Sequence, residues 1–384
     1  MDEPGRTDVI VLGLGAMGSA AAYHLARRGT RVVGIEQYTP AHDRGSSHGR
    51  SRIIREAYFE HPDYVPLIQR AYELWGTLQE ETGSRLLLPT GGLMIGPHDG
   101  TLVQGALVSA RTHHLVYELL DSGQLRARYP AFRVPDDAVA VWEPRAGVLF
   151  PEACVLAHLH GATRSGAHIR TGERVLSWHP RNGGVEVRTD RGLYAADRLV
   201  VTAGPWAGEV LAALALPLAV ERNVMYWFQP ADPAPFAPNR MPIYIYEYRK
   251  DAFIYGFPQV GGEGVKVAHH HSGEFCTPED IRREVSPEEV GRMRDILTRT
   301  LPALNGDLLQ AVTCMYTNTP DGHFIIDRHP GHPQVVLACG FSGHGFKFAS
   351  VVGEILAELA IYGHTRHPID LFRAGRFVSG QDKH

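Results

Sequence analysis

Short apolar runs and helix-like stretches alternate along the start of the chain. Residues 8–15 (DVIVLGLG) form a β-branched apolar run that ends in glycines, which is typical of a buried parallel strand entering a turn. Residues 16–29 are rich in Ala and Leu and predict a helix that ends at Gly29. A second β-branched strand follows at residues 31–36. The pattern therefore predicts a right-handed βαβ unit.

The rest of the chain mixes buried strands, alternating strands and amphipathic helices, without internal repeats or low-complexity tracts. Helices are predicted over residues 63–82, 105–120, 151–166, 287–301 and 347–362, before a coil-like tail. Strands are predicted over residues 86–95, 138–142, 185–189, 193–196, 198–203 and 335–339, and an antiparallel sheet over residues 220–267. We expect an α/β fold in which a first domain is interrupted by a second, mixed α+β domain.

Composition narrows the class of protein. The chain has 384 residues, enough for two or three domains, and its hydrophobic content of 44% with 21% charged residues is ordinary globular usage. The net charge of −4 argues against a nucleic-acid or membrane-surface partner and leaves small-molecule chemistry as the default. No run of 18 apolar residues and no signal-peptide pattern is present, so we expect a cytoplasmic protein.

The first strand ends in a GxGxxG motif at Gly13, Gly15 and Gly18, and Glu36 ends the second strand. Gly13 suits the tight turn, Gly15 lets the backbone approach a pyrophosphate, and Gly18 lets helix and strand pack closely. The Glu36 carboxylate would accept from ribose hydroxyls and repel a 2′-phosphate, which favours FAD or NAD over NADP. The alternative is a glycine-rich turn without a ligand.

A basic, glycine-bearing stretch, RGSSHGRSRIIR at residues 44–55, follows Glu36 and favours FAD over NAD. Arg52 and Arg55 are three residues apart, so on helical geometry they could point the same way, one towards a flavin and one towards a substrate carboxylate. A solvated basic loop is the alternative.

Residues 340–347 (GFSGHGFK) place three glycines before a helix, as in an anion or oxyanion site built from backbone N–H groups. Gly343 and Gly345 belong to this turn, which could hold the pyrimidine oxygen of a flavin. Lys347 at a helix start opposes the helix dipole unless an anion offsets it, which suggests function over a merely solvated lysine.

Four blocks of sequence carry a resemblance that spans almost the whole chain: Gly45 to Tyr58, Tyr255 to Pro258, Cys314 to Asp327, and Gly340 to Ser350. They resemble the monomeric sarcosine oxidase and N-methyltryptophan oxidase family, within the wider D-amino-acid oxidase superfamily of flavoproteins. The resemblance implies a Rossmann-like FAD-binding domain with an inserted mixed α+β substrate domain. We expect the discontinuous FAD-binding domain at 1–88, 146–218 and 312–384, and the substrate domain at 89–145 and 219–311.

The resemblance also implies how FAD is held. Cys314 matches the position at which these oxidases join FAD through an 8α-S-cysteinyl thioether, whereas from the residues alone it is a small buried hydrophobe. Cys154, Cys276 and Cys339 keep that second interpretation. The expected cofactor-binding residues are Gly13, Gly15, Gly18, Glu36, Ser46, Cys314, Gly343, Gly345 and Lys347.

The resemblance further assigns the substrate site. Arg55 and Lys347 would hold the substrate carboxylate, Lys266 would meet the flavin N5 through water and activate oxygen, and His270 would steer substrate charge. Taken alone, Lys266 is a surface lysine. The expected catalytic residues are Lys266, His270, Arg52, Tyr316 and His344, and the expected substrate-binding residues are Arg55, Lys347, Tyr255 and Tyr246.

The chain also contains a run of three histidines, and it differs from the family pattern at three places. His269, His270 and His271 lie on a predicted strand whose side chains alternate, so we expect no metal site there. The family loop usually reads GSHHGDTRIIR, but here Ser47 replaces a histidine and Arg50 an aspartate. The strand expected to face the pocket carries Tyr244, Tyr246 and Tyr248, where a smaller or thioether side chain is expected near Tyr246, so substrate size is open.

The reaction implied by the resemblance is oxidation of sarcosine. A hydride equivalent passes from the N-methyl carbon to the flavin, O2 reoxidises the flavin to yield H2O2, and the imine hydrolyses to formaldehyde and glycine. N-methyltryptophan or a cyclic secondary amino acid such as pipecolate or proline stays open as the substrate, as do a dehydrogenase with another electron acceptor and a non-catalytic nucleotide-binding module. We expect a monomer whose partners are a small amino acid and O2.

Overall fold

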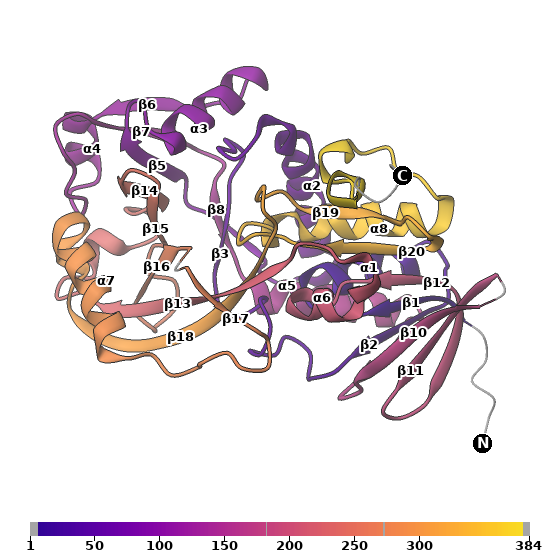
Figure 1. Cartoon of the computed structure of the whole chain (residues 1–384). Helices are drawn as coiled ribbons and strands as arrows, with labels where there is room; N and C mark the ends of the chain where they lie inside the picture. Colours follow the sequence, from indigo (N-terminus) through magenta and orange to yellow (C-terminus); the bar gives the residue numbers. More distant parts are fainter. Residues whose placement is uncertain (1–6, 182, 272, 379–384) are drawn as a thin grey trace, which may run out of the picture.

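The computed structural model describes residues 7–181, 183–271 and 273–378, arranged in two halves around three sheets (Figure 1). The eight-stranded sheet contains β1 (Thr7–Leu12), β2 (Val32–Glu36), β9 (His168–Thr171), β10 (Val175–Arg181), β11 (Gly184–Thr189), β12 (Leu193–Val201), β19 (Ile325–His329) and β20 (His332–Cys339). The helices are α1 (Ala16–Arg27), α2 (Val65–Thr82), α3 (Thr101–Thr112), α4 (Ser122–Arg128), α5 (Pro151–Arg164), α6 (Ala207–Val210), α7 (Pro287–Thr300), α8 (Ala349–Tyr362) and α9 (Gly375–Val378).

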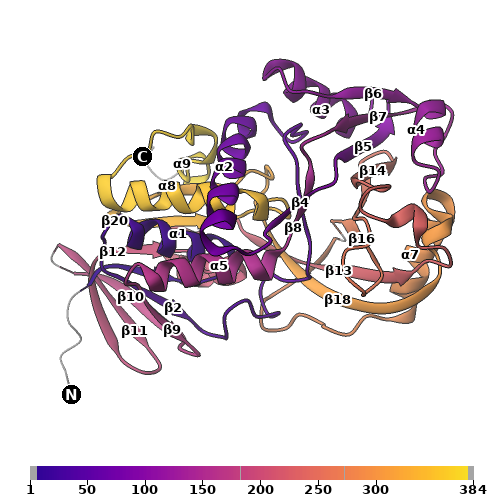
Figure 2. The same ribbon diagram turned by 180° about the vertical axis from the view of Figure 1, so that it is seen from behind.

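The eight-stranded sheet has a parallel core in the order β9, β2, β1, β12, β20. Val9 and Val11 of β1 join the cluster formed with α1, α5 and α8, whereas Ile10 and Leu12 join a cluster on the opposite face, as strand alternation requires. Figure 2 shows α1, α2, α5 and α8 grouped together beside this sheet. The predicted βαβ unit is confirmed, because β1 and β2 pair in parallel with α1 between them.

The second half is built on a nine-stranded, mainly antiparallel sheet, in which β14 pairs with β5 in parallel. Its strands are β5 (Gly92–Pro97), β6 (Glu118–Asp121), β7 (Ala138–Glu143), β13 (Ala219–Gln229), β14 (Ile243–Arg249), β15 (Ala252–Gly256), β16 (Val265–His270), β17 (Glu274–Cys276) and β18 (Asp307–Asn318). Apolar residues of α4 and α7 pack on one face, and those of α3 on the other. A small sheet of β3 (Arg52–Ile54), β8 (Gly147–Leu149) and β4 (Leu87–Pro89) lies between the halves (Figures 1 and 2).

Three element predictions differ from the structure. The helix expected over residues 105–120 is α3, Thr101–Thr112, followed by strand β6, because the left-handed backbone of His114 (φ 53°) ends helical geometry. The single strand expected over residues 86–95 is two strands in different sheets, since the chain turns at Gly91 (φ 72°). The hairpin arm and the buried strand expected near residue 200 form one strand, β12.

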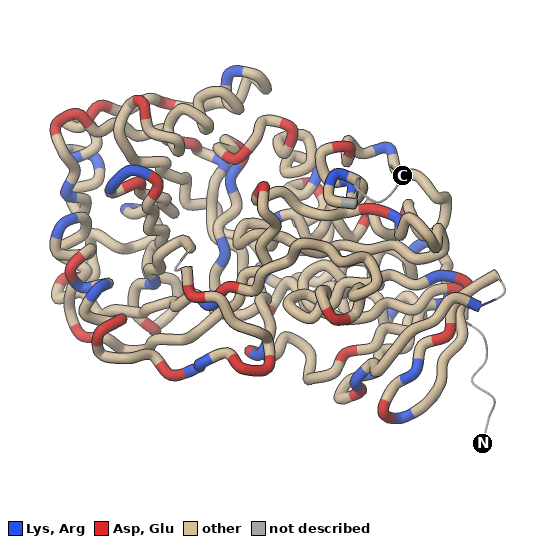
Figure 3. The backbone as a smooth tube through the Cα atoms, in the orientation of Figure 1, with Lys and Arg blue, Asp and Glu red and all other residues tan. Residues whose placement is uncertain are grey.

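The predicted α/β architecture with two kinds of sheet is confirmed. The proposed domain boundaries stay a prediction: β18 runs through the boundary at 312 and pairs with β13 along most of its length. Figure 3 shows acidic and basic residues interspersed over both halves. None of the described helices combines the length and the apolar content needed to cross a membrane.

Candidate active site

A cavity lies along the carboxyl ends of β1, β2, β12 and β20 and continues between β3, β16 and β18. The carboxyl edge of a parallel sheet is where ligands bind in doubly wound folds. Most of the residues predicted for the site line this cavity: Gly13, Gly15, Glu36, Ser46, Arg52, Arg55, Tyr255, His270, Cys314, Tyr316, Gly343, His344, Gly345 and Lys347. Three of the predicted residues, Gly18, Tyr246 and Lys266, do not.

The glycine turn at one end of the cavity leaves no room for side chains. Gly13 has φ 83°, and a Cβ there would lie 2.6 Å from the carbonyl oxygen of Thr202. A Cβ on Gly18 would lie 1.8 Å from the carbonyl oxygen of Gly13. Helix α1 starts at this turn with its N-terminus at the cavity, which provides backbone N–H groups for an anion. This is the cradle that a dinucleotide pyrophosphate requires.

Glu36 closes this end of the cavity and is fixed by three groups. Its Oε2 accepts from Leu14 N (2.9 Å), its Oε1 accepts from Tyr38 N (3.0 Å), and His42 Nε2 lies 3.4 Å away. Burial raises the pKa of Glu36, but the hydrogen bonds from His42 and Leu14 outweigh it and hold the pKa below its usual range. The carboxylate is therefore ionised and can accept hydrogen bonds from hydroxyl groups.

Arg52 joins the loop after β2 to Cys314 on β18. One Nη donates to the carbonyl of Ser46 (2.9 Å) and lies 3.7 Å from the Cys314 Sγ. The helical relation expected between Arg52 and Arg55 is wrong, because Arg52 begins strand β3 and Arg55 follows its end. Both side chains nevertheless line the cavity, one beside Cys314 and one at the far end.

Arg55 is 1% exposed and is held at the end of the cavity opposite the main dinucleotide turn. One Nη donates to Ala57 O (2.9 Å), and the other donates to both carboxylate oxygens of Glu60 (2.8 and 2.7 Å). Its guanidinium also lies over the Tyr58 ring, 4.2 Å from the centroid. The buried Nε of Arg55 has no hydrogen-bond partner among the described residues, and the Arg55 residue borders the cavity.

Lys347 lies beside Arg55 in the 3-10 turn Phe346–Phe348 that leads into α8. Its Nζ donates to His344 O (2.7 Å) and to the Tyr58 hydroxyl (3.4 Å). Burial, together with the nearby Arg55 charge, lowers the pKa of Lys347 to about 7. An anion bound between the two cations would favour the charged form.

His344 and Tyr58 are linked by a hydrogen bond of 2.6 Å between Nδ1 and the hydroxyl. The other ring nitrogen of His344 lies 3.0 Å from Gly322 O. Burial lowers the pKa of His344 to about 4, so the ring is neutral at pH 7. His344 therefore orients Tyr58 and adds no charge to the cationic end of the cavity.

His270, Tyr316 and Tyr255 form an aromatic wall. His270 Nδ1 lies 3.3 Å from the Tyr316 hydroxyl, and the His270 ring packs edge-on against Tyr255 at 6.2 Å. Burial, assisted by the neighbouring His271 and Lys347 charges, lowers the pKa of His270 well below its usual range. A neutral imidazole thus faces the cavity beside two phenol rings.

Lys266 lies behind the cavity wall. Its Nζ donates to the carbonyls of Gly49 (2.7 Å) and Ser51 (2.9 Å) and lies between the rings of Trp227 and Phe257. Burial, with a contribution from Arg52, lowers its pKa well below the ordinary lysine value. The interpretation of Lys266 as a surface lysine is wrong, since its residue is 3% exposed.

Tyr246 does not face the cavity, which corrects the orientation predicted for its strand. Side chains alternate along β14, and Tyr244 and Tyr246 both pack in the core formed with α4 and α7. The Tyr246 hydroxyl donates to Arg133 O (3.2 Å). Ile245 lines the cavity instead.

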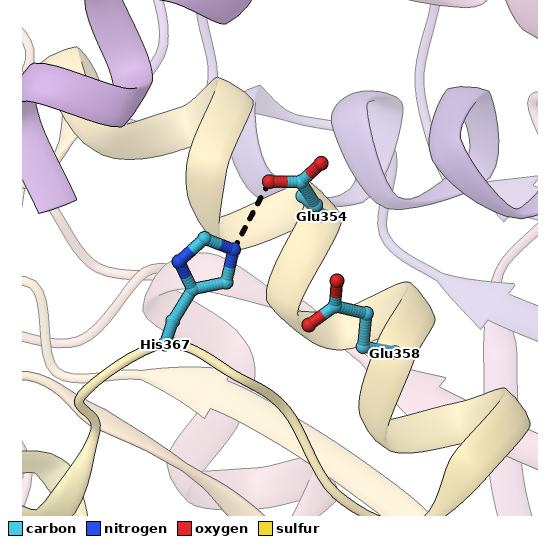
Figure 4. Close-up of side chains that lie close together, drawn as sticks. All are labelled: Glu354, Glu358 and His367. Atoms are coloured by element: carbon cyan, nitrogen blue, oxygen red, sulfur yellow. Dashed lines mark hydrogen bonds and ion pairs between the residues drawn. The ribbon is translucent and has the colours of Figure 1, made fainter.

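A group with metal-like spacing lies outside the cavity, where Glu354 and Glu358 of α8 approach His367 (Figure 4). Glu354 accepts two hydrogen bonds from Arg70 (2.9 and 2.8 Å) and lies 3.0 Å from His367 Nε2. An Nη of Arg28 also lies 3.6 Å from a Glu354 carboxylate oxygen. Because arginine charges already neutralise Glu354, we assign the group to an ion-pair network that joins α1, α2, α8 and the C-terminal segment.

Sequence reasoning missed Glu60, Tyr58 as a partner of Lys347, and His48. His48 is 4% exposed, its Nε2 has no partner among the described residues, and burial lowers its pKa to about 3. His48 lies within the sequence block that carried the resemblance, whereas Glu60 lies two residues beyond it. In the structure, the ion pair with Arg55 and a place in the cavity wall distinguish Glu60 from a surface acid.

Comparisons with known proteins agree with this geometry. A family model described as FAD dependent oxidoreductase matches residues 8–359. The chain is 50% identical over 376 residues to a monomeric sarcosine oxidase of Streptomyces avermitilis, covering 97% of this chain and 98% of that protein. It is 36% identical to an N-methyl-L-tryptophan oxidase of Yersinia pestis, covering 96% and 99% of the two chains.

Solved structures show the same fold. NikD, an amino acid oxidase of nikkomycin biosynthesis, superposes with a TM-score of 0.84 at 25% identity, covering 96% of this chain and 97% of that one. The L-proline dehydrogenase from P. horikoshii gives a TM-score of 0.84 at 24% identity over 98% of both chains. With a glycine turn, an ionised Glu36 and a family match over most of its length, the chain belongs to the family of FAD-dependent oxidoreductases.

Proposed function

We propose that the protein is an amine oxidase that converts sarcosine, O2 and water to glycine, formaldehyde and H2O2. The observation that carries this proposal is the pair of buried cations, Arg55 and Lys347, at the end of the cavity beside the neutral His270. A small amino acid needs such a site for its carboxylate and an uncharged wall for its amine. The similarity to a monomeric sarcosine oxidase supports sarcosine as the substrate.

The residues present fit FAD. The glycine turn would hold the pyrophosphate, Glu36 the ribose, and the turn that contains Gly343 and Gly345 the flavin end. Bound there, FAD supplies the acceptor for the hydride equivalent removed from the amine. We further propose that Cys314 attaches FAD covalently, which its position beside Arg52 at the cavity supports.

The carboxylate of the substrate would bind Arg55 and Lys347. The Nε of Arg55 is a buried donor without a partner among the described residues, and Lys347 presents its ammonium from the adjacent turn. Glu60 already balances part of the Arg55 charge. This arrangement orients one small amino acid with its nitrogen away from the two cations.

The amine has to lose its proton before oxidation, because the nitrogen lone pair drives the loss of hydride. Arg52, Arg55 and Lys347 surround the substrate end with positive charge, which lowers the pKa of a bound ammonium group. His270 is neutral and lies against Tyr316, so it can accept a hydrogen bond without adding charge. We propose that His270 and Tyr316 orient the neutral amine.

Lys266 is the proposed site of oxygen activation. Burial lowers the pKa of Lys266, and the negative charge that electron transfer brings into the site would favour its protonated form. A protonated Lys266 would then stabilise reduced oxygen species.

We also propose that the protein acts as a monomer in the cytoplasm, and that its partners are a small amino acid and O2 alone.

The test is the absorbance spectrum of the purified protein before and after acid precipitation, followed by anaerobic titration with sarcosine and with N-methyltryptophan. We expect yellow colour to stay with the precipitate of the parent protein and of Cys154→Ala, a control at a buried cysteine outside the cavity. Cys314→Ala should release its colour to the supernatant. Sarcosine should bleach the flavin band at a lower concentration than N-methyltryptophan.

Each outcome bears on a separate part of the proposal. Colour released by the parent would contradict attachment at Cys314 and leave amine oxidation standing. Bleaching by N-methyltryptophan alone would replace the substrate. Bleaching by sarcosine without H2O2 in air would indicate a dehydrogenase.

A further inference from the structure

Glu143, at the end of β7, is a buried carboxylate to which the reaction assigns no role. It is 1% exposed, and each of its oxygens accepts one backbone hydrogen bond. Oε1 accepts from Glu56 N at 2.6 Å, and Oε2 accepts from Ala57 N at 2.7 Å. These two amides immediately follow Arg55, in the segment that also contains Tyr58 and Glu60. An acid from a distant strand therefore fixes the backbone beside the proposed carboxylate site.

Ala57 connects Glu143 to the Arg55 side chain. Its N–H is bound by Glu143, and its carbonyl accepts from an Arg55 Nη at 2.9 Å. We propose that Glu143 is a positioning residue, which holds Ala57 so that Arg55 presents its guanidinium to the substrate carboxylate. This inference rests on the proposed function, because it needs Arg55 to bind a carboxylate.

The ionised form of Glu143 is the one that suits this role. An ionised carboxylate accepts from both amides, whereas a protonated carboxyl group turns its O–H towards one of the two N–H groups and loses that bond. Burial raises the pKa of Glu143 to about 7, against the lowering effect of the two backbone bonds. Positioning of Arg55 should therefore weaken as the pH falls through 7.

The charged groups around Glu143 come from each segment packed against it. Glu56 raises the pKa of Glu143 and is itself paired with Arg145 (2.9 Å), while Arg55 lowers it. From α2, the Tyr72 hydroxyl donates to Arg145 O (2.8 Å). The two arginines near Glu143 are thus already paired with other carboxylates: Arg145 forms an ion pair with Glu56, and Arg55 forms one with Glu60.

The chain offers a matched control in Glu247 of β14. Glu247 is 3% exposed and also accepts from two backbone amides, those of Leu102 (3.1 Å) and Asp251 (3.3 Å). These amides belong to the start of α3 and the turn after β14; α3 packs against Ala57, but neither amide hydrogen-bonds to Arg55 or to residues 56–57. Glu143→Gln and Glu247→Gln therefore remove the same kind of interaction from two different segments.

The experiment measures the affinity of the holoenzyme for acetate, a carboxylate without an amine, by the change in flavin absorbance at pH 6 and pH 8.5. We expect Glu143→Gln to weaken acetate binding about tenfold at pH 8.5, and at most about threefold at pH 6, because the parent is already protonated there. With sarcosine, KM should rise while kcat changes less than about twofold. Glu247→Gln should match the parent in all three quantities.

Acetate binding by Glu143→Gln that equals the parent at pH 8.5, or an equal loss in Glu247→Gln, would overturn the proposal. If Glu143→Gln does not hold FAD, Glu143→Asp takes its place: reduced affinity with unchanged kcat supports the proposal, and parent-like affinity overturns it. If the parent binds acetate with an affinity that depends on Glu143 but does not oxidise sarcosine, the result would contradict the proposed substrate alone. A parent that binds no acetate would contradict the carboxylate site itself.

Discussion

The two ends of the cavity are built by different means. The dinucleotide end is made by backbone: Gly13 and Gly18 let strand, turn and helix approach within contact distance, and Glu36 lies only 22 residues from its partner Leu14. The substrate end is made by side chains from separate segments, with Arg55 after β3, His270 on β16 and Lys347 before α8. We therefore expect one added atom at the dinucleotide end to abolish folding and FAD binding, whereas substitutions at the substrate end should weaken ligand binding by degrees.

The largest expected effect is at the glycine turn. Gly18→Ala places a Cβ 1.8 Å from Gly13 O, and the Gly13 carbonyl and the Gly18 Cα that carries this Cβ belong to backbone that cannot shift without opening β1 from α1. We expect Gly18→Ala to yield little folded protein and no bound FAD, as judged by the ratio of absorbance in the flavin band to that at 280 nm.

Gly76→Ala is the control for this substitution. Gly76 also lies within a helix, α2, but a Cβ there meets no atom within 4 Å. Alanine should keep full FAD content and stabilise the protein by up to about 1 kcal/mol, because it removes glycine from a helix interior. FAD retained by Gly18→Ala would show that the close packing at the turn is not required.

A graded effect is expected at Lys347, from the pH dependence of acetate binding. Because its pKa is lowered to about 7, Lys347 is charged below pH 7 and loses its charge as the pH rises through 7. Lys347→Gln should weaken acetate binding about tenfold at pH 6 and by no more than about threefold at pH 8.5.

This trend is opposite in sign to the one expected for Glu143, whose carboxylate acts above pH 7. The parent should therefore show little net pH dependence, whereas Glu143→Gln should expose the Lys347 trend, with affinity falling as the pH rises. An equal loss in Lys347→Gln at both pH values would mean that its ammonium does not titrate in this range.

The same contrast decides what could be predicted from the sequence. The glycine turn and Glu36 are local in the chain, so spacing alone placed them correctly. Glu143 and Glu60 act through contacts that no local pattern marks, because Glu143 is 86 residues from Ala57 and Glu60 looks like any surface acid. The helix expected from the spacing of Arg52 and Arg55 is not formed. Residues 52–54 are strand β3, and both arginine side chains still line the same cavity.

The strand β14 shows how a one-residue error reverses a prediction. The aromatic alternation at Tyr244 and Tyr246 predicts a strand face towards the pocket, but those rings fill the core beneath α4 and α7. Large aromatic side chains gain more from full burial than from lining a cavity. The residue between them, Ile245, is left to shape the substrate end.

The smallest expected effect tests these two faces against each other. Tyr246→Phe removes the hydrogen bond to Arg133 O, and Ile245→Val removes one methylene group; each should lower the free energy of unfolding by about 1 kcal/mol, measured by urea titration. Because only Ile245 borders the cavity, Ile245→Val should raise the kcat/KM for N-methyltryptophan relative to sarcosine about threefold, and Tyr246→Phe should leave that ratio unchanged. A change in the ratio with Tyr246→Phe would mean that the core behind β14, and not only its cavity face, sets the size of the substrate.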